Sequence, residues 1–129
     1  MVNLNSLDNL KIVSFNCNGV SSKLPVIANL CESADLVLLQ ETWLLPVDQN
    51  LLDSVSSEFC SFSSSSVDMN ELLQGRPYGG LSFLWRKSLD QNLKLITFDD
   101  DRIVGISLKA ENKDLLLLNV YLPYYSDVN

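Results

Sequence analysis

The chain has 129 residues, with 9 Lys and Arg against 16 Asp and Glu, three Cys and no His. This length suits a single domain, and a hydrophobic content of 47% excludes general disorder. Because His is absent, these residues cannot assemble a Ser-His-Asp triad, an imidazole base or a His metal ligand. The net charge of −7 argues against holding nucleic acid through bulk charge, but it is compatible with a site that works through a divalent cation.

The cysteines and the apolar segments bear on where the protein resides. Cys17, Cys31 and Cys60 are scattered and odd in number, so we interpret them as small core residues rather than as disulfide partners or metal ligands. Residues 1–10 lack the features of a signal peptide, and the apolar runs are shorter than the ~18 residues of a membrane span. We therefore expect an intracellular protein, nuclear or cytoplasmic, that is neither secreted nor inserted in a membrane.

The first part of the chain is predicted to form a strand, a helix and a second strand. Residues 11–17 are predicted as a strand, with Val13 and Phe15 on one face and Ile12 and Ser14 on the other. Residues 23–32 carry an apolar stripe with helical spacing, and Ser21 or Ser22 is expected to cap that helix. Residues 35–40 form an apolar run without alternation, as expected for a strand that is covered on both faces.

This order of elements places two polar residues at one edge of the sheet. A strand–helix–strand crossover is nearly always right-handed, with its two strands parallel. Asn16 and Glu41 then follow the carboxyl ends of two parallel strands, which is the edge where α/β sheets bind ligands.

The rest of the chain is predicted to consist mainly of strands. Asp48 to Ser56 suggests a second, weaker helix, and 70–80 is a loop rich in Gly and Pro. Further strands are expected beside Phe59 and Phe62 and over 81–86, 93–98, 104–108 and 115–122. The last of these reads as a central strand that Pro123 ends. No repeat or internal boundary divides the chain, so the predicted fold class is α/β, with parallel pairing early and hairpins later.

Glu41 is the sharpest candidate for a functional residue. An acid that directly follows a buried strand either faces a ligand or has simply reached solvent, and position alone favours solvent. The residues that follow it, 42–45, are largely apolar, which favours a half-buried carboxylate that a cation could balance.

Other polar residues have structural explanations that compete with functional ones. Asn16 and Asn18 before Gly19 fit ordinary turn chemistry, and Tyr121 fits a buried ring with its hydroxyl at the edge of a sheet. Arg76 in Arg-Pro-Tyr-Gly-Gly fits a turn with a solvated side chain better than a contact to phosphate.

Taken together and in order, these segments resemble the endonuclease/exonuclease/phosphatase superfamily, and most of all the apurinic-type endonuclease domain of non-LTR (LINE-type) retrotransposons. The resemblance covers about residues 10–125. The motifs that carry it are Asn-x-Asn-Gly at 16–19, Gln-Glu-Thr at 40–42, Gly-Gly at 79–80 and Tyr-x-Pro at 121–123.

The resemblance implies a role for each matching residue. Glu41 would be a direct ligand of Mg²⁺ or Mn²⁺, and Asn16 would help to hold the metal, the attacking water and the scissile phosphate. Tyr121 would donate a hydrogen bond to that phosphate, and Asn18 would be an outer contact to substrate. Tyr124 stands where many relatives carry an Asn that contacts DNA. The implied reaction is metal-dependent hydrolysis of a DNA phosphodiester.

The resemblance also implies that half of the domain is missing. Relatives carry a later Asp-x-Asn pair and a Ser-Asp-His ending, and neither occurs in these residues. We therefore interpret residues 1–129 as the N-terminal half of one domain, half of a four-layered α/β sandwich with a mixed sheet and flanking helices, inactive alone. An uncovered sheet face should make this half poorly soluble or molten. A reverse transcriptase domain in the same full-length protein is an expected partner, with DNA as substrate.

Two other functions stay open from sequence alone. The first is a phosphoesterase of the same fold that acts on phosphoinositide-like substrates, since the early motifs are shared across the superfamily. The second is a non-catalytic fragment that binds a partner through the uncovered sheet.

Overall fold

The computed structural model describes residues 9–72, 75–111 and 113–122. In chain order, its strands and its α-helix are β1 (Ile12–Asn16), α1 (Leu24–Ser33), β2 (Leu36–Gln40), β3 (Phe59–Ser64), β4 (Leu81–Arg86), β5 (Leu93–Thr97), β6 (Ile103–Lys109) and β7 (Asp114–Val120). Short 3₁₀ helices lie between them: η1 (Pro46–Asp48), η2 (Leu51–Ser54) and η3 (Lys87–Asn92). None of the helices in these ranges is long and apolar enough to cross a membrane.

The strands form two sheets. The first has the order β1-β2-β4-β3, with β1 and β2 parallel across the α1 crossover and the other neighbours antiparallel. The second is the antiparallel meander β5-β6-β7. The predicted α/β class, with parallel pairing early and hairpins later, is confirmed.

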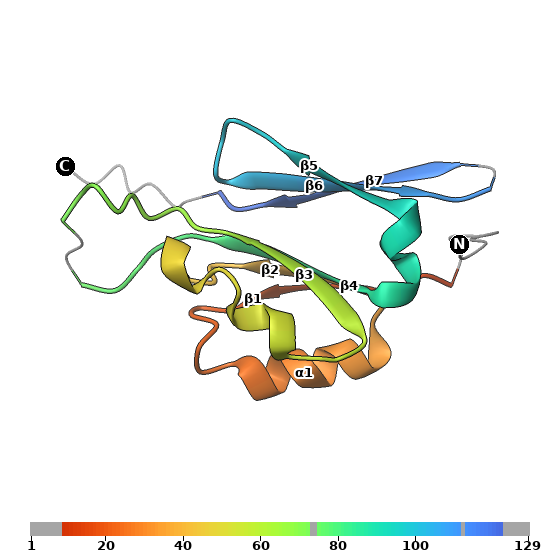
Figure 1. The fold of residues 1–129 in the computed structure, drawn as a ribbon, viewed down its shortest axis with the longest axis horizontal. Helices are drawn as coiled ribbons and strands as arrows, with labels where there is room; N and C mark the ends of the chain where they lie inside the picture. Colours follow the sequence, from red (N-terminus) through yellow and green to blue (C-terminus); the bar gives the residue numbers. More distant parts are fainter. Residues whose placement is uncertain (1–8, 73–74, 112, 123–129) are drawn as a thin grey trace.

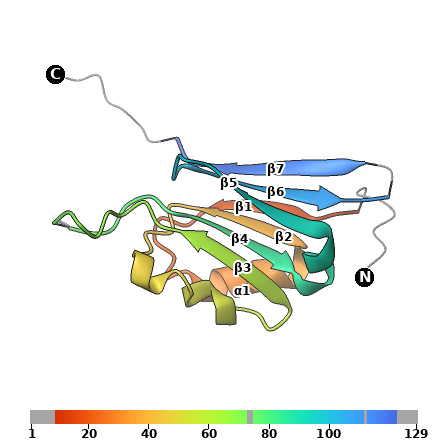
Figure 2. The same cartoon turned by 45° about the horizontal axis from the view of Figure 1, so that its top comes forward.

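The sheets and helices stack in three layers (Figures 1 and 2). Ile27 and Cys31 of α1 and Leu52 of η2 pack on one face of the first sheet. The other face of that sheet packs against the inner face of the second sheet and forms a second core. The buried residues of this core are Leu36, Leu38, Leu81, Phe83, Trp85, Leu89, Val104, Ile106 and Leu108. Both faces of β2 are therefore covered, which explains why its sequence shows no alternation.

Two local predictions about helices are wrong. α1 begins at Leu24, with Lys23 in the capping position and no side-chain cap, so neither Ser21 nor Ser22 caps it. Pro25 in the first turn has no N–H, which leaves one fewer donor for a cap to satisfy. The predicted helix over Asp48 to Ser56 is two separate 3₁₀ turns, because Asp, Asn and Ser dominate this segment and support an α-helix poorly.

The prediction of β7 as a central strand is also wrong. Among the described residues β7 is an edge strand that pairs only with β6. Leu115 and Leu117 face the core between the sheets, whereas Leu116 and Leu118 are 60% and 46% exposed on the outer face. The two inner faces therefore cover each other, and the apolar surface left open is the outer face of the second sheet, where the described residues provide no further layer.

Candidate active site

The ends of β1 and β2 lie side by side, as the sequence predicted. Asn16 pairs with Gln40 in the parallel register, and the Cys17 N–H donates to the Gln40 carbonyl at 2.8 Å. One residue further, the Gly19 N–H donates to the Glu41 carbonyl at 2.9 Å. Asn16 and Glu41 therefore occupy the same edge of the first sheet, although no hydrogen bond among the described residues joins their side chains.

The backbone that carries Glu41 is strained. Glu41 and Trp43 have φ values of 52° and 60°, in the left-handed region that residues other than glycine rarely adopt. Hydrogen bonds hold this segment from both sides, because Val20 N–H donates to the Thr42 carbonyl at 3.0 Å and Trp43 N–H donates to the Gly79 carbonyl at 2.9 Å. Such strain costs about 1–3 kcal/mol per residue and persists only where the surroundings fix it, most often at functional sites.

Two of the motif glycines are required by this strained segment. Gly19 has a φ of 93°, and a Cβ there would lie 2.6 Å from the Trp43 ring. Gly80 has a φ of 95°, and a Cβ there would overlap the Thr42 hydroxyl. The Asn-Gly, Gln-Glu-Thr and Gly-Gly motifs therefore depend on one another through close packing around residues 41–43.

Tyr121 completes the cluster from the second sheet. Its hydroxyl donates to Glu41 Oε1 at 3.3 Å, and its N–H donates to the Arg102 carbonyl at 3.0 Å. Burial raises the pKa of the Tyr121 hydroxyl, the Glu41 carboxylate raises it further, and Arg76 acts in the opposite direction. Glu41 is half-buried, and no cation within the described ranges lies at ion-pair distance from it.

Asn16 and Asn18 form a local turn at this edge. The Asn18 N–H donates to Asn16 Oδ1 at 3.1 Å, and Asn18 has a φ of 49°. The turn chemistry predicted from Asn-x-Asn-Gly is therefore present. It occupies one of the two lone pairs of Asn16 Oδ1 and leaves the exposed amide N–H₂ group for other partners.

Asn119 is a residue that the sequence reasoning missed. Its side chain is 1% exposed, and its Nδ2 donates to the carbonyls of Leu39 at 3.0 Å and Ser82 at 2.9 Å. Its Oδ1 accepts a hydrogen bond from Gln40 Nε2 at 2.8 Å. One side chain of β7 thus fixes the second sheet to β2 and β4 next to Glu41. The sequence feature that could have indicated it is the position of this Asn inside the apolar run of residues 115–122.

Two cavities lie in the same region as residues 42 and 121. The larger, of about 440 Å³, is lined by residues that include Asn18, Trp43 and Asp48. The smaller, of about 250 Å³, is lined by Tyr78 and Tyr121 among others. Tyr121 therefore borders the smaller cavity and Thr42, the residue after Glu41, borders the larger, whereas Glu41 itself lines neither.

Comparison with known protein families identifies the family of this chain. Residues 13–128 match the endonuclease/exonuclease/phosphatase family. The chain belongs to that family. No protein of curated function matches the sequence closely enough to be compared with it.

Solved structures share the fold of this family member. An AP endonuclease from Leishmania major superposes with a TM-score of 0.63 and 13% identity, over 88% of this chain and 40% of its own. A 3′ phosphatase from Neisseria bound to a product DNA hairpin gives 0.58 and 19%, over 87% and 41%. The endonuclease domain of TRAS1, a telomere-specific non-LTR retrotransposon, gives 0.54 and 13%, over 88% and 46%. This member spans less than half the length of each of these structures.

The cysteines of this family member take no part in the site. Cys17, Cys31 and Cys60 are free, and burial raises the pKa of each thiol, that of Cys17 to about 12. Cys17 and Cys31 are buried in the core and Cys60 packs against it, so the interpretation of the cysteines as core residues is confirmed. Tyr124 and Pro123, which the resemblance singled out, lie outside the described residues.

Proposed function

We propose that this chain supplies the first half of the active site of a metal-dependent DNA endonuclease of a retroelement. The observation that carries the proposal is the hydrogen bond of Tyr121 to a half-buried Glu41 carboxylate with no cation of the described residues at ion-pair distance, at the sheet edge shared with Asn16. A carboxylate in that setting is stabilised when a cation binds to it.

The donors present suit Mg²⁺ or Mn²⁺. Glu41 offers a carboxylate that forms no ion pair with the described residues, and Asn16 offers an amide oxygen with one lone pair still available. Mg²⁺ takes one or two carboxylates and keeps several waters, so one acid suffices. When bound, the ion would supply the positive charge that stabilises a phosphoryl group under attack. With the metal bound to Glu41, the Tyr121 hydroxyl would donate its hydrogen bond to a phosphate oxygen in place of Glu41, and Asn18 would contact the substrate further along the edge.

We also propose that these 129 residues do not cleave DNA alone. Hydrolysis needs a group that orients and deprotonates water. The sequence has no His that could act as that group, and Glu41 is already assigned to the metal. A longer polypeptide would supply those groups, and we expect a reverse transcriptase domain in the same protein. DNA is favoured as the substrate because solved neighbours include two endonucleases and a phosphatase bound to DNA.

The metal assignment is tested on this chain without DNA. Mn²⁺ at substoichiometric concentration should broaden the NMR signals of residues around Glu41 and Asn16, and Glu41→Gln should abolish that broadening. Glu32→Gln is the matched control, because Glu32 is an exposed acid on α1. Equal broadening in wild type and Glu41→Gln would refute the metal site.

The reaction is tested by the nicking of supercoiled plasmid in Mg²⁺. The 129-residue chain should be inactive. The longest natural protein that contains this sequence should be active, and Glu41→Gln should remove that activity while Glu32→Gln keeps it. Nicking by the 129-residue chain itself would show that the proposed dependence on further groups is wrong.

A further inference from the structure

Arg76 is not the freely solvated side chain that its turn-like sequence suggests. Its guanidinium lies over the Trp43 ring, 3.9 Å from the ring centroid, and Nη1 donates to the Pro77 carbonyl at 3.1 Å. A Cβ on Gly19 would lie 2.6 Å from the same ring, so Trp43 is packed between that backbone and Arg76. Trp43 Nε1 is buried without a hydrogen-bond partner in the described part of the chain, so packing rather than hydrogen bonding fixes the indole.

Arg76 differs from the other two arginines in its partners. Arg86 forms ion pairs with Asp35 and Glu58, and Arg102 forms one with Asp100. No carboxylate among the described residues lies at ion-pair distance from Arg76. An exposed guanidinium without an acidic partner, on a chain of net charge −7, is available to an external anion.

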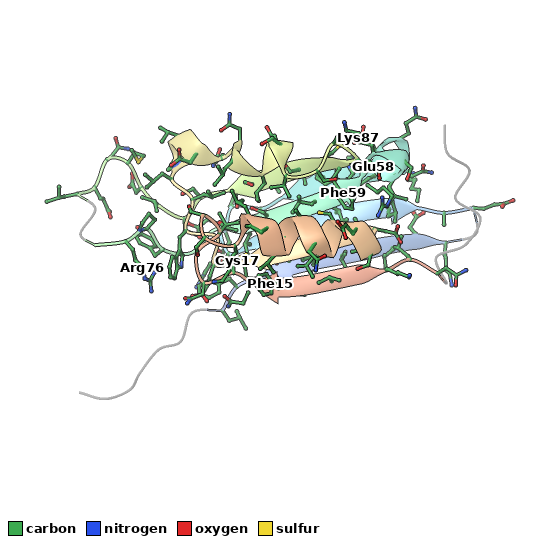
Figure 3. The ribbon with its side chains drawn as sticks, turned by 90° about the horizontal axis from the view of Figure 1, so that it is seen from below. Phe15, Cys17, Glu58, Phe59, Arg76 and Lys87 are labelled. Atoms are coloured by element: carbon green, nitrogen blue, oxygen red, sulfur yellow. The ribbon has the colours of Figure 1, made fainter. Side chains whose placement is uncertain are left out.

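The position of Arg76 relates it to the candidate active site. It stacks on Trp43, which follows Glu41 by two residues, and its positive charge lowers the pKa of Tyr121 against the opposing effect of burial. The neighbouring Pro77 lines the larger cavity and Tyr78 lines the smaller one. In Figure 3 Arg76 lies further toward one end of the molecule than Cys17, on the side away from Glu58 and Lys87.

We propose that Arg76 is a substrate-binding residue that holds a backbone phosphate of nucleic acid beside the Glu41–Tyr121 pair, with Trp43 as the residue that positions it. The proposal rests on the proposed function and names a contact for its substrate. Stacking covers one face of the planar guanidinium and leaves its N–H edges free, and those edges match two phosphate oxygens. Because the guanidinium is already ordered, little conformational entropy is lost when phosphate binds.

The three arginines allow a direct test by NMR. The sequence contains only Arg76, Arg86 and Arg102, so the 129-residue chain gives three Nε–Hε signals, and the one missing from Arg76→Lys is that of Arg76. A short DNA duplex should shift the Arg76 signal and leave that of Arg86 unchanged, since Arg86 is paired at the far end of β4. A duplex of the same sequence with an uncharged methylphosphonate backbone should shift neither. An unchanged Arg76 signal at saturating DNA would overturn the proposal.

Affinity and its salt dependence provide an independent measurement. Arg76→Ala should weaken duplex binding at low salt about tenfold, the effect of one charge-assisted hydrogen-bonded contact. The slope of log Kd against log salt concentration should fall by about one, as for the loss of one phosphate contact. Lys113→Ala removes the same charge before β7, at the opposite end of that strand from Tyr121, and should change neither quantity. Equal slopes for Arg76→Ala and Lys113→Ala would refute the phosphate contact.

Failure of this proposal is distinguishable from failure of the proposed function. The Mn²⁺ experiment reports on Glu41 without DNA, so a metal site with an unresponsive Arg76 would leave the function standing and overturn only the phosphate contact. If Mn²⁺ does not bind at Glu41 but DNA shifts the Arg76 signal, the phosphate contact would stand and the metal assignment would be overturned. If the wild-type chain binds no duplex at all, the role of Arg76 is overturned, and the Mn²⁺ result still decides the metal assignment.

Discussion

Tyr121 and Glu41 are 80 positions apart in the sequence, and the Tyr121 hydroxyl donates a hydrogen bond to the Glu41 carboxylate at 3.3 Å. They follow strands of different sheets, β7 and β2, so the contact exists only when the sheets pack face to face. The buried Asn119 side chain, two residues before Tyr121, makes that packing specific by bonding to β2 and β4.

The titration of Tyr121 should make stability depend on alkaline pH. Its folded-state pKa is raised, so its contribution to the free energy of unfolding is complete below the ordinary tyrosine pKa of about 10 and is lost as pH rises through the folded value. Urea unfolding from pH 8 to about 11 should therefore show a steeper loss of stability for wild type than for Tyr121→Phe.

The comparison between variants removes other groups that titrate in this range. The Cys17 thiol, with a pKa raised to about 12, destabilises both proteins equally as pH rises. Tyr78→Phe, which changes an exposed tyrosine, should keep the wild-type pH dependence. Identical pH profiles for wild type and Tyr121→Phe would show that the hydroxyl is not held against Glu41.

Replacing Asn119 should destabilise the junction between the sheets. Asn119→Leu keeps a similar volume but removes the hydrogen bonds to two carbonyls and to one N–H of the Gln40 amide, whose other hydrogen bond goes to Ser14. Each unsatisfied group costs about 1–3 kcal/mol, so we expect the free energy of unfolding in urea to fall by roughly 2–4 kcal/mol. Asn29→Leu, on the exposed face of α1, should change it by less than about 0.5 kcal/mol. A comparably small effect at position 119 would contradict the structural role.

Gly80 should tolerate a side chain less well than Gly75. Both have positive φ, 95° and 81°, so alanine is strained at either position by about 1–2 kcal/mol. A Cβ at Gly80 also overlaps the Thr42 hydroxyl, whereas a Cβ at Gly75 meets nothing within 4 Å. Gly80→Ala should therefore lower the urea midpoint more than Gly75→Ala, and it should also shift the NMR signals of Glu41 and Trp43. Equal midpoints for the two variants would mean that Thr42 gives way freely.

Local patterns predicted the parts of the fold that depend on neighbours in sequence. The faces of β1, the apolar run of β2 and the helical stripe of α1 are properties of short segments, and the parallel pairing expected of such a crossover then placed Asn16 and Glu41 at one edge. For the same reason the motif glycines could be recognised as turn residues before their contacts were known.

Contacts between distant segments could not be predicted in this way. Asn119 looks like an interruption of an apolar strand until β2 and β4 are placed against it, and Arg76 looks solvated until the strained Trp43 backbone brings the indole beneath it. The edge position of β7 was hidden because Leu116 and Leu118 are as apolar as their buried neighbours. The sequence shows which side chains are apolar, but the packing of the layers determines which of them are buried.

The outer face of the second sheet should drive self-association of this chain. Leu116, Leu118 and Val120 are exposed on one face of β7, and Phe98 is exposed directly after the end of β5. Contiguous apolar surface on an unpaired edge strand favours association between molecules. We expect concentration-dependent association in sedimentation velocity, and the double substitution Leu116→Thr with Leu118→Thr should reduce it.

Threonine keeps both the net charge and the strand propensity, so a reduced mass would report the loss of apolar surface alone. The control is Val47→Thr, which makes the same kind of change at a side chain that is 72% exposed on η1, in the helical layer. That variant should associate like wild type, because an isolated exposed apolar residue is normal for a protein surface. Association that persists in the β7 variant would place the contact elsewhere, and a monomeric wild type would show that this apolar face is tolerated in water.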